Sequence, residues 1–197
     1  MTIKSRIQPS ITCVAKSQTQ LPLFASCTHS QSAEVNLAAQ LHHIIGAAAQ
    51  VQDVVRRYFH TIHLWMPVLN EASHMTQLET LPAKPQASYV LLTLSMALIV
   101  TNPSLQSATV ETPLYAAVKA GIGLVESASE FSTDLVRAKL LLSLFEFGHG
   151  IEPAAYVSIG DVVRTAAAIG VNGRACSDRV GSEEDLRLWW GIVTLDR

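Results

Sequence analysis

Residues 182–197 read SEEDLRLWWGIVTLDR, and this stretch decides the predicted fold. A hydroxyl at Ser182 followed by three acidic residues is typical of a helix N-terminus, because these groups accept hydrogen bonds from free backbone N–H groups and face the positive end of the helix dipole. The apolar residues that follow cover most of the helix circumference, which predicts a helix buried on several sides. They are Leu186, Leu188, Trp189, Trp190, Ile192, Val193 and Leu195.

The paired indoles of Trp189 and Trp190 dominate this helix. Adjacent side chains on a helix point about 100° apart, so at least two neighbouring elements should pack against them. Burial of both rings would remove roughly 300–500 Å² from water, which sets an upper bound of about 8–12 kcal/mol. The helix reaches Asp196 and Arg197 with no glycine or proline to end it, and we therefore expect a truncated piece of a longer protein.

The composition predicts an all-α protein, an irregular multi-helix array with a partly disordered N-terminal tail. The 197 residues are 49% hydrophobic and 15% charged, with a mean hydropathy of +0.27, and no strand–helix alternation is visible. The longest apolar run, Tyr89–Val100, is too short to span a membrane and predicts a core helix. A net charge of −2 without a Lys/Arg cluster excludes DNA binding by this chain alone. The three cysteines are too far apart for a disulfide framework or a metal site, and we expect reduced thiols.

Two regions are expected along the chain. Residues 1–33 are rich in Ser, Thr and Gln and predict a disordered tail or linker, since no amphipathic arginine face supports a transit peptide. Residues 34–197 predict a helical domain. Its first helix, Glu34–Ile62, repeats apolar residues in steps of three and four, which fits one core-facing helix or a packing face for another chain.

Further helices are expected at residues 88–101, 113–129 and 135–147, followed by one that begins at Pro153 and ends at Gly170. The last two should form a helical hairpin, with Gly148–Gly150 ending the first of them. Gly160 has no side chain beyond a hydrogen atom, so the two helices could approach closely there. Gly170 favours the left-handed backbone conformation that ends a helix.

Three sequence blocks resemble the fungal-specific transcription factor domain, the middle homology region of the six-cysteine zinc-cluster factors. Residues 187–197 match R-x-W-W-x-x-x-x-L-D-R, residues 58–69 match Y-F-x-x-x-H-x-x-x-P-x-L, and residues 141–172 match a longer two-helix pattern. The ordered set is specific although each block alone is weak. The matching positions are Tyr58, Phe59, Pro67, Glu146, Gly150, Gly160, Arg164, Gly170, Arg187, Trp189, Trp190, Asp196 and Arg197.

The resemblance implies a non-enzymatic regulatory domain that acts in the nucleus and takes part in the control of RNA polymerase II transcription. The family's zinc cluster is absent from these residues, so DNA would be bound only through a missing domain, and zinc would belong to that missing cluster. No cofactor is expected in this chain, and no membrane partner. The resemblance further implies a homodimer in the full-length family, and a small-molecule inducer or co-regulator acting by an allosteric shift in packing.

Two alternatives come from other classes of protein. His60, His63, Glu71 and His74 could build an all-α metal-dependent oxidoreductase, because Glu71 and His74 have the E-x-x-H spacing of di-iron bundles. A di-iron site needs two such motifs together with two further glutamates on facing helices. A helical scaffold or interaction protein is the other alternative, but no repeat of 20–50 residues supports it.

Five charged residues are candidates for burial in the predicted core: Glu146, Arg164, Arg187, Asp196 and Arg197. A buried charge requires a partner, because an unpaired one is very costly. We expect internal ion pairs that fix helix register, with Arg164 or Arg187 paired to an acidic residue on a neighbouring helix. The alternatives are a polar patch in an inducer-binding cavity and simple exposure to solvent.

Overall fold

The computed structural model describes residues 43, 46, 48–80, 86–101, 112–173 and 183–197. Every regular element in these residues is helical and none is a strand, which confirms the predicted all-α class. The tail predicted at residues 1–33, the beginning of the helix expected from Glu34 and the cap expected at Ser182 lie outside the described residues. The elements are α2 (Ala48–His60), η1 (Ile62–Leu64), α3 (Glu71–Thr80), α4 (Ala87–Val100), α5 (Pro113–Ser127), α6 (Thr133–Gly148), α7 (Ala154–Ala168) and α8 (Glu183–Asp196).

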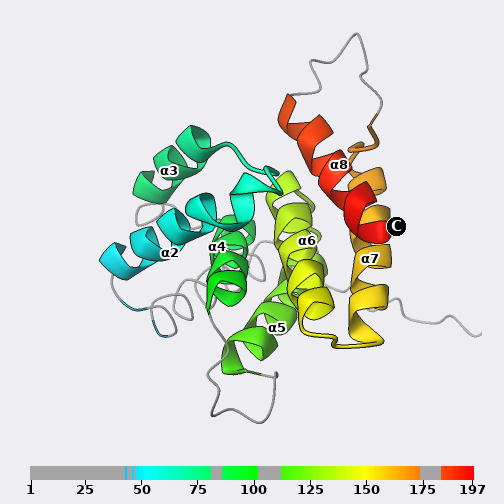
Figure 1. Cartoon of the computed structure of the whole chain (residues 1–197), viewed down its shortest axis with the longest axis horizontal. Coiled ribbons are helices and arrows are strands. Elements are labelled where there is room, and N and C mark those ends of the chain that lie inside the picture. The colour runs from blue at the N-terminus through cyan, green and yellow to red at the C-terminus, as the bar shows by residue number, and fades with distance from the viewer. Residues whose placement is uncertain (1–42, 44–45, 47, 81–85, 102–111, 174–182) are drawn as a thin grey trace, which may run out of the picture.

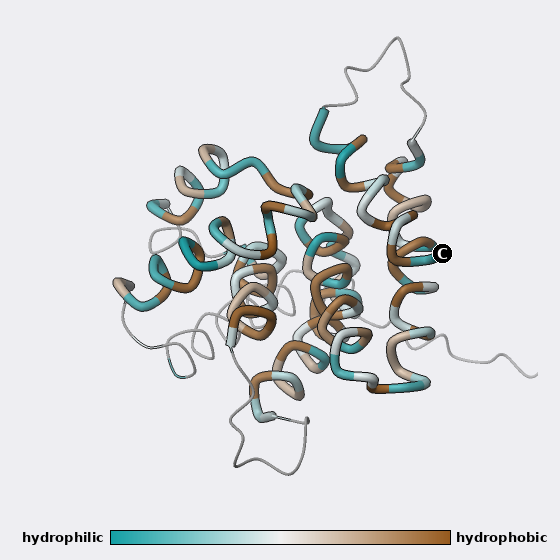
Figure 2. Tube along the Cα trace, viewed as in Figure 1, coloured by the Kyte–Doolittle hydropathy of each residue, from teal (hydrophilic) through white to brown (hydrophobic). Residues whose placement is uncertain are grey.

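Helices α4 and α6 form the centre of the molecule. In Figure 1 they lie between α2 and α3 on one side and α7 and α8 on the other, with α5 packed against both. The apolar colour in Figure 2 concentrates on these central helices. Helix α4 is buried continuously from Ala87 to Leu98, so the long apolar run is a core helix as predicted. None of the helices in the described part of the chain has the length and hydropathy needed to cross a membrane.

Local signals set the ends of the helical hairpin formed by α6 and α7. The Ser132 hydroxyl accepts a hydrogen bond from the Leu135 backbone N–H at 3.2 Å and caps α6. Gly150, with φ of +63°, turns the chain after α6, and Gly170, with φ of +89°, follows the end of α7. The two helices pack side by side (Figure 1), which confirms the predicted hairpin.

Helix α2 packs its apolar seam against α4. Val51, Val54, Val55 and Tyr58 are buried on this seam, while the other residues between Val51 and Tyr58 face solvent. The core-facing interpretation of the periodic pattern is therefore confirmed for α2. The helix ends at His60, two residues before the predicted end, and a short 3-10 turn follows it.

Helix α3 was not predicted, because its sequence carries almost no apolar periodicity. Only His74 and Leu78 are buried on it. The local signal for its start is Asn70, whose side-chain oxygen accepts a hydrogen bond from the Ser73 backbone N–H at 3.1 Å. Such a polar helix needs a tertiary contact to stay in place, and the Tyr89 hydroxyl provides one by donating to the His74 carbonyl at 2.8 Å.

Helix α8 buries one face rather than most of its circumference, which corrects the sequence-based prediction. Leu188, Gly191 and Ile192 are buried, and a Cβ added at Gly191 would lie 2.7 Å from Val68 Cγ1. Trp189 is half-buried, whereas Trp190 is 65% exposed. The two indoles diverge around the helix, and in the described chain neighbouring elements cover only the face that meets α6, α7 and residues 66–68.

Candidate functional site

Three charged residues are buried on α6: Arg137, Lys139 and Glu146. This helix has no solvent-facing stripe between Leu135 and Ser143, so its charged side chains are enclosed together with its apolar ones. We call these three residues with their ion-pair and hydrogen-bond partners the α6 charge network. Each of them reaches a different set of neighbouring elements.

Arg137 joins α6 to α8 and to the segment before α3. Its Nε donates to the Val68 carbonyl at 3.2 Å, and its two terminal nitrogens lie 2.9 Å from carboxylate oxygens of Asp134 and Glu184. The guanidinium group can use its five donors in this way because it is planar and always charged. Arg137 is therefore the buried arginine that ties α8 to the core.

Lys139 connects α5, α6 and α7. Its Nζ lies 2.6 Å from Asp161 Oδ2 and donates to the Thr165 hydroxyl at 2.8 Å, and it also forms an ion pair with Glu126. The lysine side chain is only 3% exposed, while both carboxylates reach solvent. One buried ammonium thus holds acidic groups from the helices on either side of α6.

Glu146 is fully buried near the other end of α6. Its Oε1 accepts a hydrogen bond from the Tyr115 hydroxyl at 2.7 Å and lies 2.8 Å from Lys119 Nζ, while Oε2 has no partner among the described residues. Burial and the bond to Glu146 raise the pKa of the Tyr115 hydroxyl. Burial alone would lower the pKa of Lys119, but hydrogen bonds to Glu146 and Tyr115 and the glutamate charge outweigh it and raise that pKa. Both partners of Glu146 therefore hold their protons at neutral pH.

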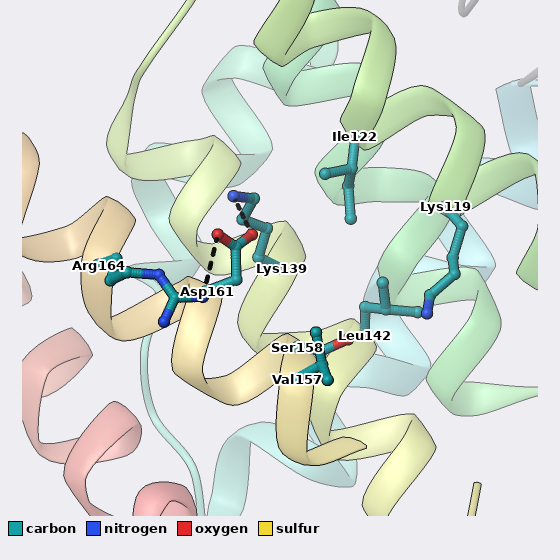
Figure 3. A pocket seen from close by; sticks show the side chains of 8 residues that line it. All are labelled: Lys119, Ile122, Lys139, Leu142, Val157, Ser158, Asp161 and Arg164. Carbon is teal, nitrogen blue, oxygen red and sulfur yellow. Dashed lines mark hydrogen bonds and ion pairs between the residues drawn. The ribbon is translucent and has the colours of Figure 1, made fainter. Parts of the chain in front are cut away.

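A pocket of about 250 Å³ opens beside this network, between α5, α6 and α7. Figure 3 shows Arg164 and Lys119 on opposite sides of it, with the apolar side chains between them. Lys139 and Asp161 form one wall, so a buried member of the network is also part of the pocket surface. Its lining residues are Lys119, Ile122, Lys139, Leu142, Val157, Ser158, Asp161 and Arg164.

A second buried polar region lies where α2, η1, α3 and α4 meet. We call it the His74 cluster; it comprises Tyr58, Phe59, His63, His74 and Tyr89, whose rings are in mutual contact. Both ring nitrogens of His74, Nδ1 of His63 and the Tyr58 hydroxyl are buried without a hydrogen-bond partner in the described chain. Burial, helped by the charge of Arg137, lowers the pKa of His74 to about 4. This imidazole is therefore neutral at physiological pH.

The residues of the metal-site alternative do not converge. His60 and Glu71 are exposed, His63 is half-buried on η1, and His74 lies between the rings of Phe59 and Tyr89. Across the residues with a described placement, no three His, Cys, Asp or Glu side chains are grouped to hold a metal ion.

The residues of the three sequence blocks occupy different environments. Tyr58, Phe59 and Glu146 are buried, and Trp189 is half-buried, while the others are partly or fully exposed. A Cβ added at Gly160 would meet only the Arg164 side chain, so Gly160 does not allow a close approach of helices as expected. The exposed or partly exposed positions are Pro67, Gly150, Gly160, Arg164, Gly170, Arg187, Trp190, Asp196 and Arg197.

The predicted ion pairs of Arg164 and Arg187 with neighbouring helices are wrong. The Arg164 side chain is 72% exposed and that of Arg187 is 42% exposed, and each faces a carboxylate on its own helix: Arg187 contacts Glu183 at 2.5 Å, and Arg164 lies 4.0 Å from Asp161. Exposed pairs of this kind cost little desolvation and contribute little stability. Of the five charges expected to be buried, only Glu146 is.

The buried bases Arg137 and Lys139 were missed, although a signal for them exists. The run LVRAKLLLSLF at residues 135–145 contains apolar residues at nearly every helical phase, which indicates burial on all sides. A basic residue inside such a run has no solvent-facing position available and must be paired internally. Asp134 adjoins the run, but the partners on other elements cannot be read from it: Asp161 lies 22 residues after Lys139, and Glu184 lies 47 residues after Arg137.

Comparison with known proteins assigns the class of protein. The family described as the fungal specific transcription factor domain matches residues 55–197, which include every helix from the end of α2 onward. The chain belongs to this family and is a regulatory domain of a fungal transcription factor.

A relative supports the same assignment. The chain is similar to "Transcription factor BOA15" of Botryotinia fuckeliana (strain B05.10), with 26% identity over 144 residues, which cover 73% of this chain and 78% of that protein. No solved structure matches the chain.

Proposed function

We propose that this domain acts without catalysis, in the nucleus, and controls a transcription factor through changes in its own helix packing. The observation that carries the proposal is the position of Lys139. The same ammonium group holds α5 and α7 to α6 and forms part of the pocket wall. A ligand that contacts this wall would favour one arrangement of the three helices over another, which is the differential binding that allostery requires.

The family supports the remaining parts of the proposal. DNA would be bound by a six-cysteine zinc cluster outside these residues, and zinc would be needed only there. The net charge of −2 and the absence of a basic cluster in the sequence fit a domain that does not bind the phosphate backbone itself. We further propose that the full-length protein is a homodimer and that a small molecule in the α5–α6–α7 pocket acts as its inducer.

A reporter assay tests the regulatory role. The 197-residue chain is placed between a heterologous DNA-binding domain and an activation segment, and Asp161→Asn is compared with Asp53→Asn. Asp161 pairs with buried Lys139, whereas Asp53 forms an exposed pair with Arg57 within α2. We expect Asp161→Asn to change reporter output by about fivefold or more at equal protein level, and Asp53→Asn to leave it unchanged.

Equal output from the fusion and from a version lacking the chain would overturn the regulatory role. Equal output from the wild type and Asp161→Asn would also overturn it, since the packing of α5, α6 and α7 would then have no effect on reporter expression. The same fusion, carrying a fluorescent label and no added localisation signal, reports where the protein lies in the cell. Exclusion of this fusion from the nucleus would contradict nuclear action.

A further inference from the structure

The α5–α6–α7 pocket is open to solvent, and its volume indicates how much of a ligand it can enclose. At roughly 30 Å³ for each water molecule, a cavity of about 250 Å³ holds about eight waters. Pockets for drug-sized ligands begin at about 300 Å³. The pocket therefore suits a small molecule with about eight non-hydrogen atoms.

Each carboxylate around the pocket already contacts a lysine, but Asp161 and Glu126 share Lys139, so the lysines do not match every acidic charge. The pocket lining itself carries three cations, Lys119, Lys139 and Arg164, against one carboxylate, Asp161. Asp161 Oδ2 lies 2.6 Å from Lys139 Nζ, and Glu126 pairs with the same ammonium. Glu146 pairs with Lys119 at 2.8 Å. A cationic ligand would meet repulsion here, because the cations that line the pocket outnumber its one carboxylate.

Two cations at the pocket keep unused hydrogen-bond donors. The Arg164 guanidinium has five N–H donors, is 72% exposed, and among the described residues faces the acidic oxygen of Asp161 only at 4.0 Å, beyond hydrogen-bond length. The Lys119 ammonium has three donors, two of which serve Glu146 and Tyr115. An anion at this pocket can therefore be bound without breaking an internal pair.

The space between these cations is apolar. Figure 3 shows Ile122 on one side and Leu142 and Val157 on the other, with Arg164 and Lys119 at the two ends. Inorganic anions would leave these three side chains uncovered, whereas an aliphatic chain would cover them and gain the free energy of apolar burial. Asp161 would repel an anion, but it is the one acidic residue among the pocket's lining residues, which include three cations.

We propose that the pocket binds a small aliphatic carboxylic acid as its carboxylate. Arg164 pairs with the carboxylate, and the hydrocarbon chain lies on Ile122, Leu142 and Val157. This inference rests on the regulatory role proposed above and specifies the chemical class of the inducer. Binding beside Lys139 links the ligand to the side chain that joins α5, α6 and α7.

Calorimetric titration of the full 197-residue chain with three matched probes at neutral pH tests the inference. Hexanoate, hexanamide and hexylamine share a similar length and differ in charge. We expect hexanoate to bind with one-to-one stoichiometry and about tenfold more tightly than hexanamide, because hydrogen bonds to charged groups are stronger than neutral ones.

Variants locate the binding to the pocket. Arg164→Gln should weaken hexanoate binding about tenfold and leave hexanamide binding unchanged, because it removes the charge of an exposed side chain without disturbing the core. Arg57→Gln on α2 is the matched control, since it also removes an exposed arginine that pairs within its own helix. That variant should bind hexanoate as the wild type does.

Four results would each overturn the inference: no hexanoate binding, equal affinity for hexanoate and hexanamide, tighter binding of hexylamine, or unchanged hexanoate affinity in Arg164→Gln. None of them would overturn the regulatory role, because the reporter comparison of Asp161→Asn with Asp53→Asn needs no added ligand. Conversely, if hexanoate binds selectively but the reporter does not respond to Asp161→Asn, the ligand proposal stands and the regulatory role is overturned.

Discussion

The α6 charge network and the His74 cluster both bury polar groups, but they do so in opposite ways. In the network, Arg137 and Lys139 each contact several acceptors, and Glu146 uses Oε1 twice and leaves only Oε2 without a described partner. In the cluster, four polar atoms of Tyr58, His63 and His74 are enclosed by aromatic rings without hydrogen-bond partners. Partnered buried groups hold helices in register, whereas unpartnered groups weaken the region that contains them.

The charges of the residues explain the difference. An arginine or lysine cannot be neutralised at low cost, so it is buried only with acidic or carbonyl oxygens in place. Histidine can shed its proton, and the pKa of His74, lowered by burial to about 4, shows that it does so. Tyr58 likewise keeps its proton, because burial raises its pKa. The cluster is therefore sensitive to acid, and the network is sensitive to loss of a partner.

The largest effect is expected from breaking the network at Arg137. Arg137→Met should lower the free energy of unfolding by about 3–5 kcal/mol, because Asp134, Glu184 and the Val68 carbonyl lose a common cation. Urea denaturation measures the change. Arg57→Met removes an exposed pair and should cost below about 1 kcal/mol; similar losses in both variants would mean that burial of Arg137 has no energetic consequence.

The second largest effect is expected from acid, which should lower the stability of the chain through the His74 cluster. The pKa of His74 is about 4 in the folded chain against 6.5 for the free side chain, so the unfolded state binds more protons between these values. Stability should therefore fall as pH drops from 6.5 to 4, by about 3 kcal/mol at about 1.36 kcal/mol per unit of pKa. Below pH 4 this loss is complete.

The His74→Phe variant isolates that contribution. It keeps an aromatic ring and removes both unpartnered nitrogens, so at pH 7 its stability should lie within about 1 kcal/mol of the wild type or above it. The difference between the two proteins should then change with pH through the window from 6.5 to 4, measured by urea denaturation at each pH. Parallel stability curves for the two proteins would show that His74 does not titrate differently in the folded chain.

The smallest effect comes from one chemical change made in both regions. Tyr115→Phe removes a hydroxyl that donates to Glu146 at 2.7 Å and should cost about 1–2 kcal/mol, since the glutamate loses a donor. Tyr58→Phe removes a buried hydroxyl without a described partner and should be neutral or slightly stabilising. Thermal unfolding of the two variants measures both changes in stability. An equal loss of stability at both sites would show that the network and the cluster do not differ in this respect.

The helices themselves were largely predictable because their signals are local. Thr112 and Pro113 begin α5, and apolar residues recur along it with helical spacing. The seam of α2 and the apolar run of α4 were assigned to the core from periodicity and hydropathy, and both are buried. Helix α3 was not predicted in this way, since its sequence is polar and the helix depends on contacts with other helices.

The candidate site was far less predictable. Lys139 meets partners on both sides of α6, and the pocket beside it is assembled from three helices that are separated along the chain. Arg164 and Arg187 carry the same charge as Arg137 but remain exposed and pair only with carboxylates on their own helices in the described chain. Residue type predicts the need for a partner once a charge is buried, but it does not predict which charge will be buried.

The amino-acid sequence alone determined the all-α class, the approximate bounds of most helices and the family, because capping residues, apolar periodicity and ordered motifs act over short distances along the chain. Tertiary structure decided that Trp190 lies in solvent, that Arg137 and Lys139 are enclosed, and that a pocket forms beside Lys139. Burial is a property of the neighbours that a side chain meets, and those neighbours are brought together only when the helices pack.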